Sequence, residues 1–92
     1  MGKLLIYFRY VFFVFSSDVH ETRRHVHIKE RGNKNKLCKF WLEPEIELEY
    51  NYGFHRKEII AIEKLVKEYF NDIISQLFIF YSGKRVKLII KK

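Results

Sequence analysis

Two histidines one residue apart, His25 and His27, are the side chains of this sequence best suited to chemistry. Alternate residues of a strand share one face, about 6.5–7 Å apart, so one imidazole could act as general base and the other as general acid. Lys39 could stabilise the negative charge of a phosphorane. His25, His27 and Lys39 are therefore candidate catalytic residues for metal-free cleavage of RNA. Because such a histidine pair is common on strands, the sequence leaves open whether the protein is an enzyme.

Basic residues surround the histidine pair. The net charge of the 92 residues is +7, and such a field favours polyanions. Trp41 could stack on a nucleobase. Glu45, Glu47 and Glu49 would repel phosphates, so we expect nucleic acid to lie over residues 23–36. The candidate nucleic-acid-binding residues are Arg23, Arg24, Lys29, Arg31, Lys34, Lys36 and Trp41.

A metal site is a second hypothesis. Asp18, His20, His25 and His27 offer carboxylate and imidazole ligands of the kind that transition metals prefer. Their spacing matches no specific zinc signature, and histidines at i and i+2 point in parallel. The predicted site therefore contains no metal, and the sequence names no cofactor.

Two further hypotheses involve no chemistry. An exposed Trp41 beside arginine and lysine has the composition of an interaction hot spot, so the face could dock a partner protein. Alternatively, His25, His27 and Lys39 form a lattice of weak pairs with Glu47 and Glu49 on a solvated sheet face.

Alternation and helical periodicity predict the elements that position these side chains. Strands are expected at about 3–7, 11–16, 25–31 and 37–43, with another after Pro44. A helix is expected from Arg56 to about Phe80, with His55 as N-cap. The fold class is α+β: a small, mostly antiparallel sheet of about five strands packed on one C-terminal helix, with an optional edge strand at 85–91. We assign 1–83 to a single domain and 84–92 to a basic tail or edge strand.

The period of two in the strands separates two faces. His25, His27, Lys39 and Trp41 share one face, and three-residue connections would give the rows His27–Lys39–Glu49 and His25–Trp41–Glu47. The opposite face should pack beneath the helix. It contains Val26, Ile28, Cys38, Phe40, Leu42, Ile46 and Leu48. The matching helix stripe consists of Ile59, Ile62, Val66, Tyr69, Ile73 and Leu77.

Two features bear on localisation. The single cysteine, Cys38, cannot form an internal disulfide. A protein without internal disulfides is typical of a reducing compartment. The apolar run at 3–15 is too short to span a bilayer and contains Arg9, so we expect no membrane association and a cytoplasmic protein.

The segments YVFFVFSSDVHETRRHVHIKERG and LCKFWLEPEIELEYNYGFHRKEIIAIEKLVKEYF resemble a small bacterial family of unknown function, over about residues 4 to 80. Members share an H-V-H-V-like strand and a K-F-W-L-E-P run, and are often encoded beside a second small protein, as in toxin–antitoxin pairs. The resemblance implies that neighbour as a partner and, more distantly, RNA as a target; it leaves the oligomeric state open. The sequence departs from the family pattern at Arg24, where proline is usual, at Leu77, where tryptophan is usual, and in the segment after Gly83.

Overall fold

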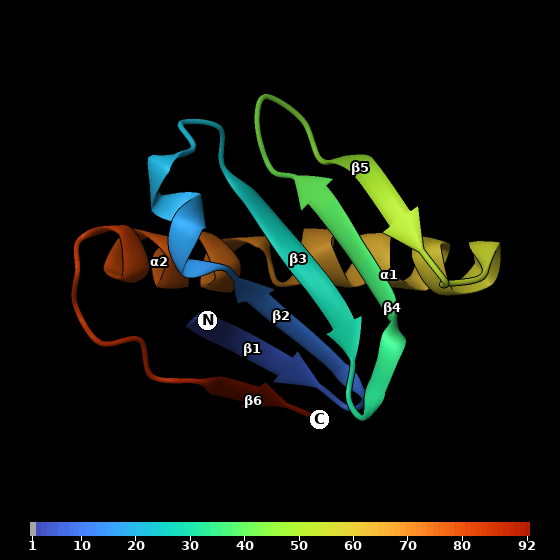
Figure 1. The fold of residues 1–92 in the computed structure, drawn as a ribbon. Coiled ribbons are helices and arrows are strands. Elements are labelled where there is room, and N and C mark those ends of the chain that lie inside the picture. The colour runs from blue at the N-terminus through green and yellow to red at the C-terminus, as the bar shows by residue number, and fades with distance from the viewer. Residues whose placement is uncertain (1) are drawn as a thin grey trace.

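The computed structural model describes residues 2–92 as one sheet, two α-helices and a short 3₁₀ helix, η1 (Figure 1). Within those residues the elements are β1 (Gly2–Tyr7), β2 (Tyr10–Val14), η1 (Ser16–His20), β3 (His25–Glu30), β4 (Asn33–Trp41), β5 (Glu47–Tyr52), α1 (Arg56–Glu68), α2 (Phe70–Tyr81) and β6 (Ile89–Lys91).

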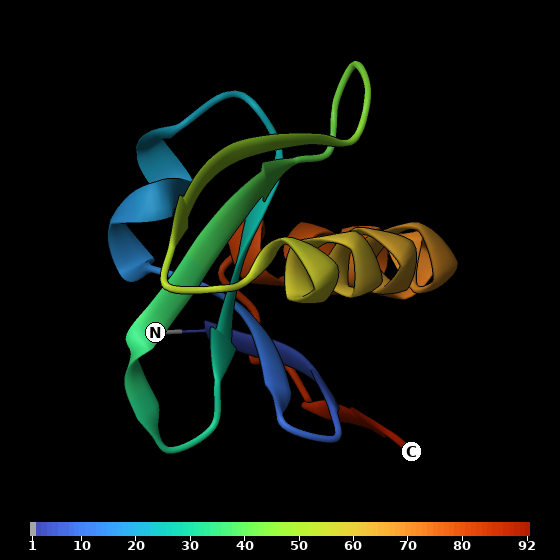
Figure 2. The ribbon, with the colours of Figure 1, turned by 90° about the vertical axis from the view of Figure 1, so that its right-hand side faces the viewer.

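The strands are ordered β5-β4-β3-β2-β1-β6, and all neighbours are antiparallel except β1 and β6, which are parallel. Figure 2 shows α1 and α2 on one face of the sheet and η1 on the other. The predicted α+β class and mostly antiparallel sheet are confirmed. The predicted count of about five strands on one helix is only roughly matched, because the edge strand forms and the helix is broken. Within residues 2–92, neither α-helix is long and apolar enough to cross a membrane.

The main core lies between the sheet and the two α-helices, as the alternation of the strands predicts. Val26 and Ile28 of β3 and Cys38 and Phe40 of β4 are fully buried in it. The predicted helix stripe packs against them, with Ile62, Val66, Ile73 and Leu77 fully buried and Ile59 and Tyr69 partly buried. Hydrophobic burial on this scale is what fixes the parity of β3 and β4, and therefore which side the histidines face.

The pairing of β3 with β4 is as predicted, with His25 opposite Trp41 and His27 opposite Lys39. The β4–β5 register is predicted correctly only for Trp41 and Glu47, because a bulge lies between Lys39 and Phe40. The bulge places Tyr50, instead of Glu49, opposite Lys39. Leu48 keeps its predicted parity opposite Phe40, but on this edge strand it is 37% exposed, so our assignment of Leu48 to the core is wrong.

The expected single helix divides at Tyr69, where φ is −100° and ψ is 21°. Neither glycine nor proline marks this position; the Tyr69 ring packs against Tyr7 of β1, with centroids 5.8 Å apart. Gln76 of α2 is not part of the predicted helix stripe, yet it is buried, and its Nε2 donates to the carbonyls of Leu4 (2.9 Å) and Lys87 (2.5 Å). These contacts attach the C-terminal segment to the sheet, and it ends in β6.

Glu58 joins the start of α1 to the sheet. Its carboxylate accepts from the His55 backbone N–H at 3.1 Å and from Lys36 Nζ of β4 at 3.0 Å. We therefore expect Glu58→Ala to lower the free energy of unfolding by about 1–2 kcal/mol, measured by urea denaturation. Glu63→Ala is the matched control: it removes only the exposed pair with Lys67, and a change above about 0.5 kcal/mol there would contradict this reasoning.

Candidate functional site

Strand β3 places His25 and His27 side by side on the face of the sheet away from α1 and α2. Their rings lie edge to face, with centroids 5.2 Å apart. Neither is solvent-exposed: His25 is 0% and His27 is 4% exposed. Phe13 of β2 stacks on His27 at 5.5 Å and Phe15 packs edge-on at 4.7 Å. The histidine face is therefore covered at this point, contrary to the hypothesis of a solvated lattice.

The cover includes η1, which lies on the face of the sheet opposite α1 and α2 (Figure 2) and brings Asp18 onto the two imidazoles. Asp18 Oδ2 is 3.3 Å from His25 Nε2 and 3.2 Å from His27 Nε2. The same oxygen accepts from the Phe15 backbone N–H at 2.6 Å, which fixes the carboxylate in place. Asp18 itself is only 5% exposed. Three polar side chains thus share one buried volume, which we call the Asp18–His25–His27 cluster.

The other nitrogen of each ring has a defined neighbour. His25 Nδ1 lies 3.0 Å from the backbone carbonyl oxygen of Arg23, and His27 Nδ1 lies 3.2 Å from the Tyr50 hydroxyl. Both Nε2 atoms, in contrast, have no hydrogen-bond partner of acceptable geometry among residues 2–92, despite their closeness to Asp18. The imidazole rings are not oriented so that a hydrogen on Nε2 would point at the Asp18 carboxylate.

Burial dominates the electrostatics of His27. It lowers the pKa of the imidazole from 6.5 to about 4, because a charged ring loses its hydration there. Asp18 works against this shift, whereas His25 and Lys39 add to it. His27 is therefore neutral near pH 7, which suits a base or a ligand but not a phosphate-binding cation.

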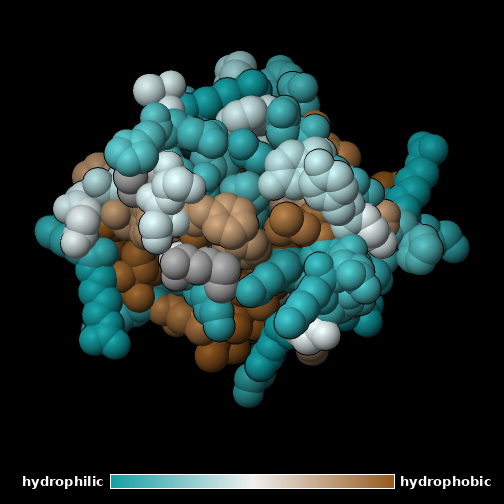
Figure 3. Space-filling model, viewed as in Figure 1, coloured by the Kyte–Doolittle hydropathy of each residue, from teal (hydrophilic) through white to brown (hydrophobic). Residues whose placement is uncertain are grey.

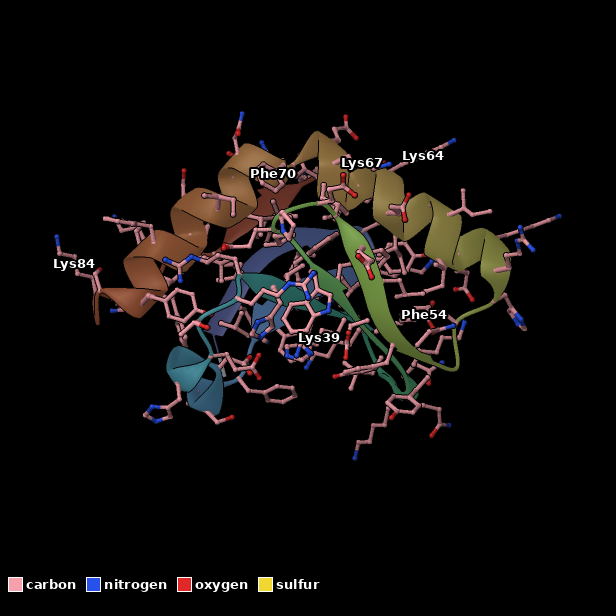
Figure 4. The ribbon with its side chains drawn as sticks, turned by 90° about the horizontal axis from the view of Figure 1, so that it is seen from above. Lys39, Phe54, Lys64, Lys67, Phe70 and Lys84 are labelled. Atoms are coloured by element: carbon pink, nitrogen blue, oxygen red, sulfur yellow. The ribbon has the colours of Figure 1, made fainter. Side chains whose placement is uncertain are left out.

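Lys39 and Trp41 lie next to this cluster in a compact arrangement of charges and rings. Lys39, only 9% exposed, has its Nζ 3.4 Å from Glu21 Oε2 and 4.3 Å from the centre of the Trp41 ring. The Arg23 guanidinium lies 4.2 Å from the same ring, and Trp41 Nε1 donates to Glu49 at 2.6 Å. Figure 4 shows Lys39 on the opposite side of the sheet from Lys64 and Lys67 of α1. Trp41 is already in contact with two cations, so its ring is less available to a base than the sequence suggests.

The other predicted nucleic-acid-binding residues do not form one continuous patch. The Arg24 guanidinium lies over the Tyr81 ring at 4.4 Å, and Lys36 pairs with Glu58 at 3.0 Å. Arg31 and Lys34 are exposed at the tip of the β3–β4 hairpin. Lys29 and Lys34 line an open pocket of about 250 Å³ beside that hairpin. The residues lining it are Phe13, Phe15, Lys29, Asn33, Lys34, Lys36 and Leu37.

Sequence reasoning found part of this site. Asp18, His25 and His27 come together, but His20, the fourth member of the metal hypothesis, is exposed and lies outside the cluster. Tyr50 was missed because strict alternation from Leu48 would turn it toward the core, and the bulge that turns it toward His27 leaves no signature in the sequence. Cys38 lies on the opposite face, where burial raises its thiol pKa to about 12, so it is chemically inert.

The fold and site together define a small α+β domain with helices on one face of a mixed sheet and a buried carboxylate–imidazole cluster on the other. The chain belongs to the family described as a domain of unknown function (DUF4160), whose model matches residues 9–76. The matched range contains the whole Asp18–His25–His27 cluster and excludes β1 and β6. No curated protein and no solved structure is significantly similar to the chain.

Proposed function

We propose that this protein binds single-stranded RNA at the β3–β4 hairpin, as the nucleic-acid-binding member of a two-gene pair of the toxin–antitoxin type. One observation carries the proposal: the pocket of about 250 Å³ beside the hairpin combines a phenylalanine-lined floor with lysines. Phe15 is 39% exposed there, so its ring is accessible from solvent.

This composition suits a nucleotide because the two parts of a nucleotide need different partners. A base stacks on an aromatic ring, and a phosphate is attracted to lysine. Only single strands present unstacked bases to such a pocket, which favours them over a duplex. Figure 3 shows apolar surface at the centre of this face with hydrophilic side chains around it, as this mode of binding requires.

The charge distribution supports the same location. The hairpin tip with Arg31 and Lys34 lies at one end of β3 and β4, whereas the loop containing Glu43 and Glu45 lies at the other end (Figure 1). RNA over the hairpin is therefore separated from Glu43 and Glu45 by the length of the strands, whereas Glu30 and Glu58, which lie nearer the hairpin, are paired with Lys36.

The proposal is binding, without cleavage by His25 and His27. A catalytic imidazole must come within about 3 Å of the 2′-hydroxyl or of the leaving oxygen. With His25 0% and His27 4% exposed, no phosphodiester reaches either ring in this conformation. An RNA cleavage assay tests this point, and cleavage that His27→Gln abolishes would contradict it.

The partner in this proposal is the small protein encoded by the neighbouring gene, and the compartment is the cytoplasm, where the buried thiol of Cys38 stays reduced. Strand β5 is one edge of the sheet and exposes Leu48 and Tyr52, by 37% and 63%, so we place the partner there. Expressing the chain with and without its neighbour, and scoring growth, tests the pairing. Unchanged growth in both cases, together with no co-purification, would contradict it.

RNA binding is tested by fluorescence anisotropy with a short labelled single-stranded RNA at low salt. We expect Phe15→Ala to weaken binding about tenfold. A single stacking contact contributes ~1–3 kcal/mol, and the contacts that remain in the variant keep the loss near the lower end of that range. Phe78→Ala is the matched control, because Phe78 is a 71% exposed phenylalanine of α2 on the opposite face. Equal affinities for the two variants would contradict the assignment.

A charge variant tests the same site without disturbing the aromatic contacts. Lys34→Glu should weaken binding several-fold and reduce the salt dependence, whereas Lys64→Glu, at an exposed position of α1, should have a smaller effect. If both lysine variants weaken binding equally, the attraction is a property of the net charge and not of the hairpin. No binding by the wild-type protein at low salt would overturn the proposed function.

A further inference from the structure

We propose that Asp18, His25 and His27 bind a divalent transition-metal ion of the zinc type. The proposal does not depend on the RNA-binding function. Its ligand atoms are the two imidazole nitrogens and the carboxylate oxygen that lie within 4.8 Å of one another. All three residues are at least nine-tenths buried, which distinguishes them from an exposed acidic cluster.

The two distances from the carboxylate to the imidazoles fit a tetrahedral ion. Zinc binds histidine nitrogen and carboxylate oxygen at about 2.0–2.2 Å, so two ligand atoms at a tetrahedral angle lie about 3.3–3.5 Å apart. Asp18 Oδ2 is 3.3 Å from His25 Nε2 and 3.2 Å from His27 Nε2. Both imidazoles therefore stand at the separation from the carboxylate that one shared ion requires.

The hydrogen bonding of His25 leaves its Nε2 free to act as a ligand. Its Nδ1 lies 3.0 Å from the Arg23 carbonyl oxygen, and because a carbonyl only accepts, Nδ1 carries the hydrogen. In the neutral ring, Nε2 then holds a lone pair, 3.3 Å from the Asp18 carboxylate. Two acceptors this close in a buried volume repel each other unless a cation lies between them. Either a metal ion or an extra proton on the imidazole satisfies this requirement.

His27 and Asp18 are oriented in the same way by their surroundings. The Tyr50 hydroxyl at 3.2 Å can accept from Nδ1 of His27, which again leaves Nε2 as the ligand atom. The Phe15 backbone N–H donates to Asp18 Oδ2 at 2.6 Å and holds the carboxylate toward both rings. Such outer contacts of the ligands are typical of metal sites, in which they set the tautomer and the ring direction.

The donor set selects the class of ion. Two imidazoles and one carboxylate suit zinc and its neighbours in the first transition series, whereas Mg²⁺ and Ca²⁺ prefer oxygen ligands alone. Three protein ligands leave one position of a tetrahedron for a further donor.

The test begins with protein stripped of metal by a chelator and then titrated with Zn²⁺. We expect one equivalent to bind and the melting temperature to rise, with no such rise in Mg²⁺. His25→Gln and His27→Gln should each weaken binding at least about 100-fold, since loss of a ligand exceeds the effect of losing an outer contact. His20→Gln is the matched control, because His20 is an exposed histidine of η1, the 3₁₀ helix that contains Asp18. This variant should bind Zn²⁺ with an affinity within about twofold of the wild type.

Two measurements on the wild-type protein keep the test decisive if a variant fails to fold. Co²⁺ should give the strong visible absorption of a four-coordinate ion, and ¹⁵N chemical shifts should identify Nε2 as the bound atom of both imidazoles. Binding well below one equivalent, binding through other atoms, or an equal loss in His20→Gln would overturn the proposal. Proton uptake by the cluster without any binding of Zn²⁺ would also overturn it and identify the proton as the occupant.

Discussion

Replacing Gly53 with alanine should lower the free energy of unfolding by at least about 3 kcal/mol. Gly53 has φ of +88° in the turn between β5 and α1, and a Cβ there would stand 2.1 Å from the backbone oxygen of Asn35. The left-handed conformation alone costs alanine about 1–2 kcal/mol. The overlap adds to this because the Cβ is fixed to the turn and the atom it meets is a backbone oxygen, so the turn has to move away from β4.

That displacement would disturb the contacts that begin the helical layer. The Asn51 side chain bonds the Phe54 backbone in both directions, at 2.9 and 3.1 Å, and Glu58 follows one turn later with its bond to Lys36. For a domain of this size, 3 kcal/mol corresponds to a fall in melting temperature of at least about 12 °C.

Gly32→Ala separates backbone strain from the close approach. Gly32 also has positive φ, +74°, but a Cβ there meets nothing within 4 Å. We expect it to cost only about 1 kcal/mol in the same urea denaturation, followed by Trp41 fluorescence. Equal losses for the two variants would mean that the turn does not lie against β4 in solution.

The alternation of β3 and β4 explains why half of the candidate site is predictable. Burying Val26 and Ile28 beneath the helices forces His25 and His27 to the opposite face, and a one-residue slip would expose the core. The hairpin then brings Lys39 beside His27. These relations are local and follow from hydrophobic burial alone.

The rest of the site depends on contacts that have no periodic signal. Ser16, Ser17 and Asp18 indicate a turn, but nothing in them shows that the turn folds back over β3 as η1. A polar face covered by a polar segment has the same sequence pattern as a polar face in water. For the same reason the bulge opposite Tyr50 and the break at Tyr69 could not be foreseen, since both are set by packing between elements.

The burial of His27 has a measurable consequence: we expect the metal-free protein to lose about 3 kcal/mol of stability as the pH falls from about 6.5 to 4. The folded-state pKa of His27 is about 4, against 6.5 for an unperturbed imidazole. Between these values the unfolded chain binds a proton that the folded chain does not, so acid favours unfolding. At about 1.4 kcal/mol per pKa unit this difference sets an upper limit of about 3.5 kcal/mol, and partial protonation at the two ends of the pH range reduces the expected loss to about 3 kcal/mol.

Burial of the imidazole, which is the first and largest cause of the lowered pKa, determines the sign of this effect. Asp18 of η1 favours the charged ring, whereas His25 of β3 and Lys39 of β4 oppose it, and burial is the largest contribution. Carboxylates with lowered pKa, such as Glu58, also make the fold acid-sensitive, but in the range below their ordinary value of 4.5. The window above pH 4.5 therefore separates the effect of His27 from that of these carboxylates.

His27→Gln tests this origin through the slope of stability against pH, and not through stability itself. The substitution keeps a polar side chain but removes the titrating ring, so the stability should change much less between pH 6.5 and 4.5 than in the wild type. His20→Gln removes an exposed imidazole and should leave the wild-type slope intact. If His27→Gln and the wild type lose stability in parallel across this window, His27 is not held neutral by burial, and η1 does not close over the histidine face in solution.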